Sequence, residues 1–275
     1  MRPVYGHFTD AIENEWHRKA ISNHLLCDET GYYTINFVVL ESKCADPKNK
    51  VLIFCSPANP VGRVWTKKEI LKVEEICVRH HVFVISDEVH CDHLRKGVTH
   101  YPYLSVCKNK GNAMAIVGVN KSFNMAGLSC SNAVIQDEAL RKKFLASYVY
   151  PWPSAFAIAG QIAAYNESRD WMEQVCAYIE GNMDWAIAFF QKEMPKLKVR
   201  KPEGTYCLWL DFRSFGLEDK EIHRRIYGEA NVILQDGVIH DPDTGEGWQR
   251  MCVPCPRPLL KEACERMAKA FKDVK

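Results

Sequence analysis

Three short runs of apolar residues, about thirty residues apart, constrain the fold of this chain more than any other feature. The runs cover residues 51–55, 82–85 and 113–117. Short runs without polar alternation are typical of strands that are buried on both faces. Between the first two runs, Thr66 and Glu69 have the spacing of a helix capping box, and apolar residues follow at helical spacing. The pattern predicts a strand-helix-strand unit with a right-handed crossover into a parallel sheet.

The C-terminal part of the chain has a different pattern. Apolar residues recur at spacings of three and four from Trp171 to Phe190, which predicts one long helix. Beyond it, residues 205–210 are typical of a strand, and residues 218–227 and 259–271 of helices. We therefore expect a large α/β domain over residues 1–170, followed by a connecting helix and a smaller α+β domain over residues 171–275.

Composition excludes several classes of protein. The 275 residues carry 36 Lys+Arg and 34 Asp+Glu, a net charge of +2, which indicates no nucleic acid or anionic membrane partner. No apolar run approaches the roughly 20 residues that a membrane helix needs. The first thirty residues lack the pattern of a signal peptide, so the 12 cysteines indicate reduced thiols and a cytoplasmic location.

Polar residues follow each of the three buried runs. Asn59 follows the first run, Asp87 and His90 follow the second, and Lys121 follows the third. Ligands of parallel α/β sheets bind beyond the carboxyl ends of the strands, so we expect these side chains to converge. A desolvated lysine beside a carboxylate is suited to forming a Schiff base with a carbonyl cofactor, and pyridoxal 5'-phosphate fits best.

The motifs around these residues resemble those of the MalY/PatB-type cystathionine β-lyases. The resemblance rests on Asn-Pro-Val-Gly-Arg-Val-Trp at 59–65, Ile-Ser-Asp-Glu-Val-His at 85–90, Asn-Lys-Ser-Phe-Asn-Met-Ala-Gly-Leu at 120–128, Pro-Glu-Gly-Thr-Tyr at 202–206 and Gly-Glu-Gly-Trp-Gln-Arg-Met at 245–251. It covers essentially the whole chain. These lyases are fold type I pyridoxal-phosphate enzymes of the class I/II aminotransferase family, so the resemblance implies an α/β fold with a mostly parallel sheet flanked by helices.

The resemblance also implies a role for each matching residue near the cofactor. Lys121 would bind pyridoxal phosphate as a Schiff base and then move protons at the substrate Cα. Asp87 would keep the pyridine nitrogen protonated, which makes the ring an electron sink. Asn59 and His90 would hydrogen-bond the phenolic oxygen of the ring, and Tyr5 would stack on its face.

Arg250 would bind the α-carboxylate of an amino-acid substrate, a task suited to a planar guanidinium. The implied reaction is α,β-elimination of cystathionine or a cysteine S-conjugate to pyruvate, ammonia and a thiol, carried out by a homodimer. Aminotransfer is the nearest alternative, because the same lysine can return the proton to the cofactor carbon.

The sequence departs from the family pattern at its beginning, just before Lys121 and just after Arg250. Family members begin with a segment whose turn binds the cofactor phosphate, and we expect this chain, beginning at a strand that carries Tyr5, to lack it. Gly118 and Asn120 stand where relatives commonly have small hydroxyl or proline residues, and Cys252 replaces a common asparagine. A truncated, catalytically silent binding or dimerisation module is therefore the alternative from a different class.

Simpler structural interpretations exist for each candidate. Lys121 fits a solvated surface residue, Asp87 a turn former, Tyr5 a packing residue and Arg250 an ion-pair partner. The acidic and imidazole residues from 87 to 93 suggest a metal site, but alternate residues of an extended segment face opposite ways, so we expect no metal. The C-x-x-C pattern at 252–255 has no second pair, and we interpret it as two incidental thiols.

Overall fold

The computed structural model describes residues 1–149 and 152–274, and its main sheet has the order β3-β4-β5-β6. The strands are Val51–Cys55 (β3), Phe83–Asp87 (β4), Ala113–Val117 (β5) and Asn132–Val134 (β6). The first three are parallel, and β6 runs antiparallel to β5. The three apolar runs therefore form adjacent strands, as predicted, and place their carboxyl ends along one edge of the sheet.

Helix α3 (Lys67–Arg79) connects β3 to β4, as the capping-box spacing predicts. The Thr66 hydroxyl accepts a hydrogen bond from the Glu69 amide at 3.2 Å, and the Glu69 carboxylate accepts one from the Thr66 amide at 2.8 Å. The helix buries Ile70 and Val73 against the sheet, at the spacing of one helical face. This reciprocal cap explains why the helix begins where it does.

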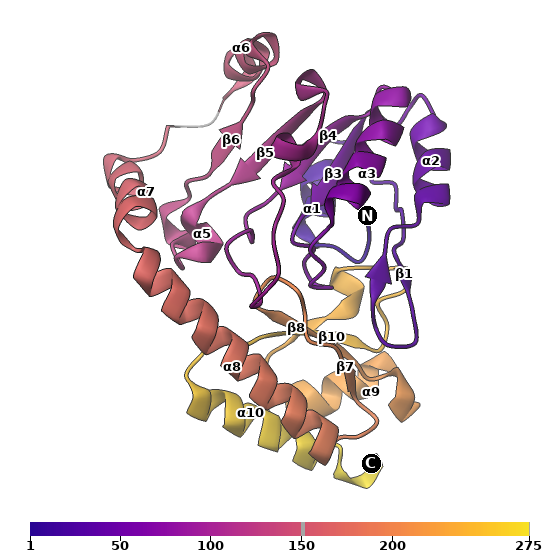
Figure 1. Cartoon of the computed structure of the whole chain (residues 1–275). Helices are drawn as coiled ribbons and strands as arrows, with labels where there is room; N and C mark the ends of the chain where they lie inside the picture. The colour runs from indigo at the N-terminus through magenta and orange to yellow at the C-terminus, as the bar shows by residue number, and fades with distance from the viewer. Residues whose placement is uncertain (150–151, 275) are drawn as a thin grey trace.

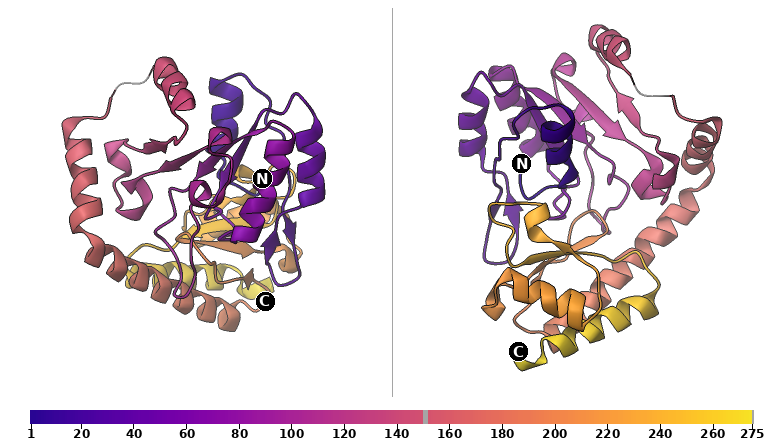
Figure 2. Two further views of the ribbon diagram at one scale, coloured as in Figure 1. Left: turned by 45° about the horizontal axis from the view of Figure 1, so that its top comes forward. Right: turned by 180° about the vertical axis from the view of Figure 1, so that it is seen from behind.

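A second sheet lies in the C-terminal part, and all of its strands are antiparallel. Its order is β7-β8-β10-β9, with strands Lys198–Val199 (β7), Cys207–Asp211 (β8), Gln235–Asp236 (β9) and Trp248–Cys252 (β10). The long helix α8 (Arg169–Glu193) passes beside this sheet, and α10 (Arg257–Ala270) lies along it (Figure 1). The two further views show α8 running from α7 (Ala155–Glu167) to the second sheet (Figure 2).

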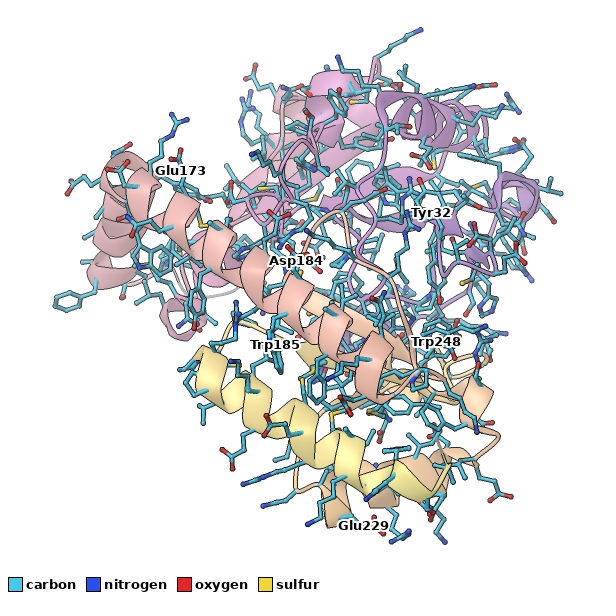
Figure 3. The ribbon with its side chains drawn as sticks, turned by 60° about the horizontal axis from the view of Figure 1, so that its bottom comes forward. Tyr32, Glu173, Asp184, Trp185, Glu229 and Trp248 are labelled. Atoms are coloured by element: carbon cyan, nitrogen blue, oxygen red, sulfur yellow. The ribbon has the colours of Figure 1, made fainter. Side chains whose placement is uncertain are left out.

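Two hydrophobic clusters hold these sheets. One surrounds Phe190 of α8 and Leu208 of the second sheet, and Trp185 on α8 lies toward α10 beside it (Figure 3). The other surrounds the main sheet, yet it also contains Trp209 and Trp248 from the second sheet. The two parts are therefore packed against each other, and the domain boundary between residues 170 and 171 stays a prediction.

The remaining helices and strands are short or peripheral. They are α1 (His7–Asp10), β1 (Leu26–Cys27), β2 (Tyr33–Thr34), α2 (Phe37–Ala45), α4 (Tyr103–Val106), α5 (Val119–Ser122), α6 (Glu138–Ser147) and α9 (Asp219–His223). None of the helices in the described ranges has both the length and the apolar character that crossing a bilayer requires.

The predicted strand at Tyr5 is wrong. Arg2 forms only an isolated bridge to His24, and a helix begins two residues after Tyr5. Pro3 has no amide hydrogen with which to continue a ladder, and the Val4 amide donates instead to the His240 carbonyl at 3.1 Å.

Candidate active site

Asp87 ends strand β4 on the edge where the polar residues were predicted to converge. One carboxylate oxygen accepts a hydrogen bond from the Val89 amide at 3.2 Å. Burial raises the pKa of Asp87 to about 6, and the Val89 amide and the Lys121 ammonium oppose that rise only in part. Asp87 is thus a largely desolvated carboxyl group whose charged form would be stabilised by a further cationic partner.

The neighbouring acid, Glu88, belongs to a different environment. Its carboxylate accepts hydrogen bonds from the Ser86 hydroxyl and the Tyr103 amide, both at 2.8 Å, and lies 3.0 Å from His100 Nε2. Consecutive residues of the extended chain therefore face apart, as predicted. The three metal-capable side chains that meet within 4.8 Å in the described ranges are His24, Asp241 and Asp243, outside the 87–93 segment.

Lys121 lies on the single-turn helix α5, directly after β5. Its backbone carbonyl accepts a hydrogen bond from His93 Nε2 at 3.0 Å, which ties this helix to the segment that follows β4. The charge of Lys121 acts on two neighbouring groups: it partly opposes the burial that raises the pKa of Asp87, and it adds to the burial that lowers the pKa of His90. The structure therefore brings these three predicted residues into one electrostatic environment.

His90 is buried and has an unused hydrogen-bonding atom. Its Nδ1 has no hydrogen-bond partner among the residues that the structure describes, and its ring meets the ring of Tyr206 edge-on at 4.9 Å. Burial, together with the charges of His93, Lys121 and Arg250, lowers the pKa of His90 to about 3. The imidazole is consequently neutral at pH 7 and offers one nitrogen to a ligand.

Arg250 reaches the same site from the second sheet. It lies in β10, and its guanidinium donates from Nη1 to Asn59 Oδ1 at 3.0 Å. Its Nε is buried without a partner, and no carboxylate of residues 1–149 or 152–274 forms an ion pair with it. A buried guanidinium with unused donors is suited to binding a carboxylate from outside the chain.

Tyr5 lies at the edge of this group. Its ring contacts His7 and Phe8 edge-on, with centroid distances of 5.0 and 5.7 Å. Its phenol also contributes to the raised pKa of Tyr206, whose main cause is burial. Tyr5 is therefore near the ring that contacts His90, and it also packs against its own helix.

The motifs at 59–65 and 202–206 contact each other, which the sequence patterns do not predict. The Glu203 carboxylate accepts hydrogen bonds from Arg63 Nε at 3.0 Å and from the Val64 amide at 2.8 Å. A side chain at Gly204 would come within 2.8 Å of Pro57. The 202–206 motif thus docks on the 59–65 motif and fixes the second sheet against the first, which brings Arg250 to Asn59.

A second feature that the sequence analysis missed is a pair of thiols beside Arg250. The sulfur atoms of Cys252 and Cys207 are in contact, at a Sγ–Sγ distance of 3.7 Å. The two face each other across β8 and β10. The sequence-local pattern drew attention to Cys255, whereas the cross-strand partner depends on a register that spacing alone does not give.

Comparisons with known proteins identify the family. The model of the aminotransferase class I and II family matches residues 2–267. Cystathionine β-lyase PatB of Bacillus subtilis is 37% identical over 98% of this chain and 70% of its own length. Protein MalY of Escherichia coli is 27% identical over 99% of this chain and 70% of its own length.

Solved structures show the same relationship. Cystalysin from Treponema denticola, which contains pyridoxal 5'-phosphate, is 33% identical with a TM-score of 0.94, covering 100% of this chain and 70% of that one. The pyridoxal-phosphate-bound C-S lyase from Staphylococcus hominis is 28% identical with a TM-score of 0.92, covering 98% and 68%. The predicted fold is confirmed, and the chain belongs to the aminotransferase class I and II family, with PatB and MalY among its relatives.

Proposed function

We propose that this protein is a pyridoxal-phosphate-dependent carbon-sulfur β-lyase. Its substrates are cystathionine or cysteine S-conjugates, which it converts to pyruvate, ammonia and a thiol. The observation that carries the proposal is that Lys121, Asp87 and His90 share one environment. Beside it lies Arg250, which forms no ion pair with a carboxylate in the described part of the chain. The relationship to the B. subtilis cystathionine β-lyase supports the same reaction.

The residues fit the cofactor in their chemistry. Asp87, with its raised pKa, would hold a protonated ring nitrogen, and that cation would restore the charged carboxylate. The orphaned Nδ1 of His90 and the Asn59 amide group would be available to a ring oxygen, and Tyr5 would lie against the ring face. When bound, pyridoxal phosphate supplies a ring that stabilises negative charge at the substrate Cα.

The chain's own residues then divide the work of the reaction. Arg250 binds the substrate carboxylate, and its bond to Asn59 fixes the direction of the guanidinium. With the carboxylate held, the Cα–H bond is presented to Lys121, whose amino group removes the Cα proton. The sulfur then leaves from Cβ with the electron pair of the Cβ–S bond.

Aminotransfer would use the same first proton transfer but return the proton to a cofactor carbon. It would also need a 2-oxo acid as the second substrate. The two activities therefore separate in one assay, because only elimination releases pyruvate from cystathionine without an added acceptor.

Assembly and location are parts of the same proposal. We propose a cytoplasmic homodimer, supported by exposed apolar side chains on and before α7, which are Val149, Trp152, Phe156, Ile158 and Ile162. Such a concentration of exposed apolar residues is typical of a surface that another chain covers.

The test uses the purified full chain with added pyridoxal phosphate. We expect the visible absorption of a lysine-bound cofactor, and pyruvate release from cystathionine. Lys121→Ala removes both. Lys142→Ala is the matched control, because Lys142 lies on the exposed face of α6 in an ion pair with Glu138. Cofactor absorption without pyruvate release, but with amino transfer to a 2-oxo acid, would replace the lyase with an aminotransferase.

A further inference from the structure

The thiols of Cys207 and Cys252 occupy positions that favour a disulfide. They are directly opposed on the antiparallel strands β8 and β10. The Val253 amide donates to the Tyr206 carbonyl at 3.2 Å, so the adjacent 207–252 pair is of the non-hydrogen-bonded kind. In such pairs the Cα atoms are about 4.5 Å apart, within the range that a disulfide spans.

The two thiols differ in access. Cys207 is fully buried, whereas Cys252 is exposed. Their sulfurs are 3.7 Å apart, compared with the roughly 2 Å of a covalent S–S bond. A reagent from solvent therefore meets Cys252 first, and Cys207 stands behind it.

The charges around Cys252 favour its thiolate. A hydrogen bond with Cys207 lowers the pKa of Cys252 to about 6. Partial desolvation of the thiol opposes this shift, and the cations of Arg250 and Lys121 assist it. Arg250 lies two residues before Cys252 on the same strand, so both side chains share one face. The other titratable groups near Cys252 are Tyr206 and Cys255, whose pKa values it helps to raise.

We propose that Cys252 and Cys207 form a redox-active dithiol beside the candidate active site, which reacts with small-molecule disulfides. The Cys252 thiolate attacks one sulfur of the disulfide and expels the first thiolate. Cys207 then attacks Cys252 Sγ and expels the second. The protein loses two electrons and two protons, the small disulfide gains them, and two small thiols leave.

The oxidised state has a consequence for the site. The disulfide removes a negative charge from beside Arg250 and Lys121 and links the two strands next to the guanidinium. If the proposed lyase function holds, the thiol that it releases is itself a reductant able to reopen the disulfide. The exchange reaction needs no cofactor, so its test is independent of that function.

The chain contains a matched internal control. Cys44 and Cys77 also share a hydrogen bond, which lowers the pKa of Cys44. Both of these thiols are buried, in helices α2 and α3, and no cation contributes to the pKa of either. Because neither thiol is accessible to a reagent and no cation stabilises a thiolate, we expect this pair to stay reduced.

The experiment treats the reduced, folded full chain, without cofactor and without oxygen, with bis(2-hydroxyethyl) disulfide. Peptide mapping by mass spectrometry should find a 207–252 disulfide, with Cys44 and Cys77 unmodified. Cys207→Ser should trap the small thiol on Cys252, and Cys252→Ser should leave Cys207 unmodified. A Cys252 that links to Cys255, or that stays free while other exposed thiols react, overturns the proposal.

Thiol labelling of the unaltered chain tests the proposal without any variant, and so does not depend on whether a variant folds. The rate of iodoacetamide labelling at Cys252 should level off above about pH 6 to 7. Cys27 is the comparison. It is also exposed, but partial desolvation of its thiol raises its pKa. At pH 6 we expect Cys252 to react about tenfold faster or more, since its thiolate fraction outweighs its lower intrinsic nucleophilicity. Equal rates and parallel pH profiles contradict the proposal.

Discussion

The two sheets contribute to the site in different ways. The main sheet supplies Asp87 and Lys121 where parallel strands end, so successive crossovers return the chain to the same edge. The second sheet supplies Arg250 from the middle of an antiparallel strand, where only the alternation of faces decides what a side chain meets. Strand ends thus supply the residues proposed for the cofactor, and a strand face supplies the residue proposed for the substrate.

The largest effect should come from the main sheet. Lys121→Ala removes the group that we propose moves the Cα proton, and lost proton transfer alone costs about 10²–10⁴-fold in rate. We expect kcat for pyruvate release from cystathionine to fall by at least that factor, while Lys142→Ala stays near the unaltered protein. Comparable kcat values for the two variants would mean that the main sheet does not supply the proton-transfer group.

Substitution in the second sheet should act mainly on substrate binding. Arg250→Lys keeps the charge but loses the planar fork that donates to Asn59 and that we propose binds the substrate carboxylate. Breaking a buried, hydrogen-bonded charge pair costs about 2–5 kcal/mol. We expect kcat/KM to fall about 10²-fold, largely through KM, with cofactor absorption retained. Arg213→Lys is the control, because Arg213 pairs with Asp211 on the same sheet. Loss of cofactor absorption in Arg250→Lys would contradict the assignment of cofactor binding to the main sheet and substrate binding to the second sheet.

Asp87 makes the stability of the cofactor-free chain depend on pH. Burial raises its pKa from 3.8 to about 6, so its contribution to stability is fully present below pH 3.8 and is lost as pH rises through about 6. Between pH 7 and pH 4.5 the stability of the unaltered chain should rise by about 2 kcal/mol relative to Asp87→Asn. Urea unfolding of both proteins at the two pH values measures this difference.

The comparison with Asp87→Asn separates the effect of Asp87 on stability from that of His90, whose pH dependence has the opposite sign. Burial lowers the pKa of His90 to about 3, so its contribution is lost as pH falls below 6.5. That contribution is common to both proteins and cancels in the difference. A difference that does not change with pH would show that Asp87 is not desolvated.

The smallest effect should come from Tyr5. If its ring stacks on the cofactor, Tyr5→Ala should weaken pyridoxal-phosphate affinity by about 2–10-fold, the value of an aromatic contact beyond area burial. Tyr5→Phe should retain the affinity, because it keeps the ring. Equilibrium dialysis compares the three proteins, and equal affinity of all three would show that Tyr5 only packs against His7 and Phe8.

The parts of the molecule that sequence predicts well are those with local causes. Strands β3 and β5 coincide with their apolar runs, and α3 begins at its capping box. Asp87 and Lys121 were found because they follow such strands. The Cys207–Cys252 pair and the docking of Glu203 on Arg63 depend on contacts between distant segments, which no local pattern contains.

What the sequence did not predict also depends on contacts between distant segments. The strand expected at Tyr5 failed because Pro3 cannot donate to a ladder and the Val4 amide pairs with a distant carbonyl, that of His240. Arg250 was identified by its motif, but its unused Nε and its bond to Asn59 follow from the packing of two sheets. Local chemistry thus predicted which residues are candidates, and tertiary packing decided what each one meets.

The most direct test of the proposed site is to find which lysine binds the cofactor. The full chain is incubated with pyridoxal 5'-phosphate, the linkage is reduced with borohydride, and the modified peptide is identified by mass spectrometry. We predict that the label lies on Lys121, and that it is absent from this position when Asp87 is replaced by Ala and the cofactor is limiting. A label distributed over exposed lysines such as Lys142, with Lys121 unmodified, would contradict the account.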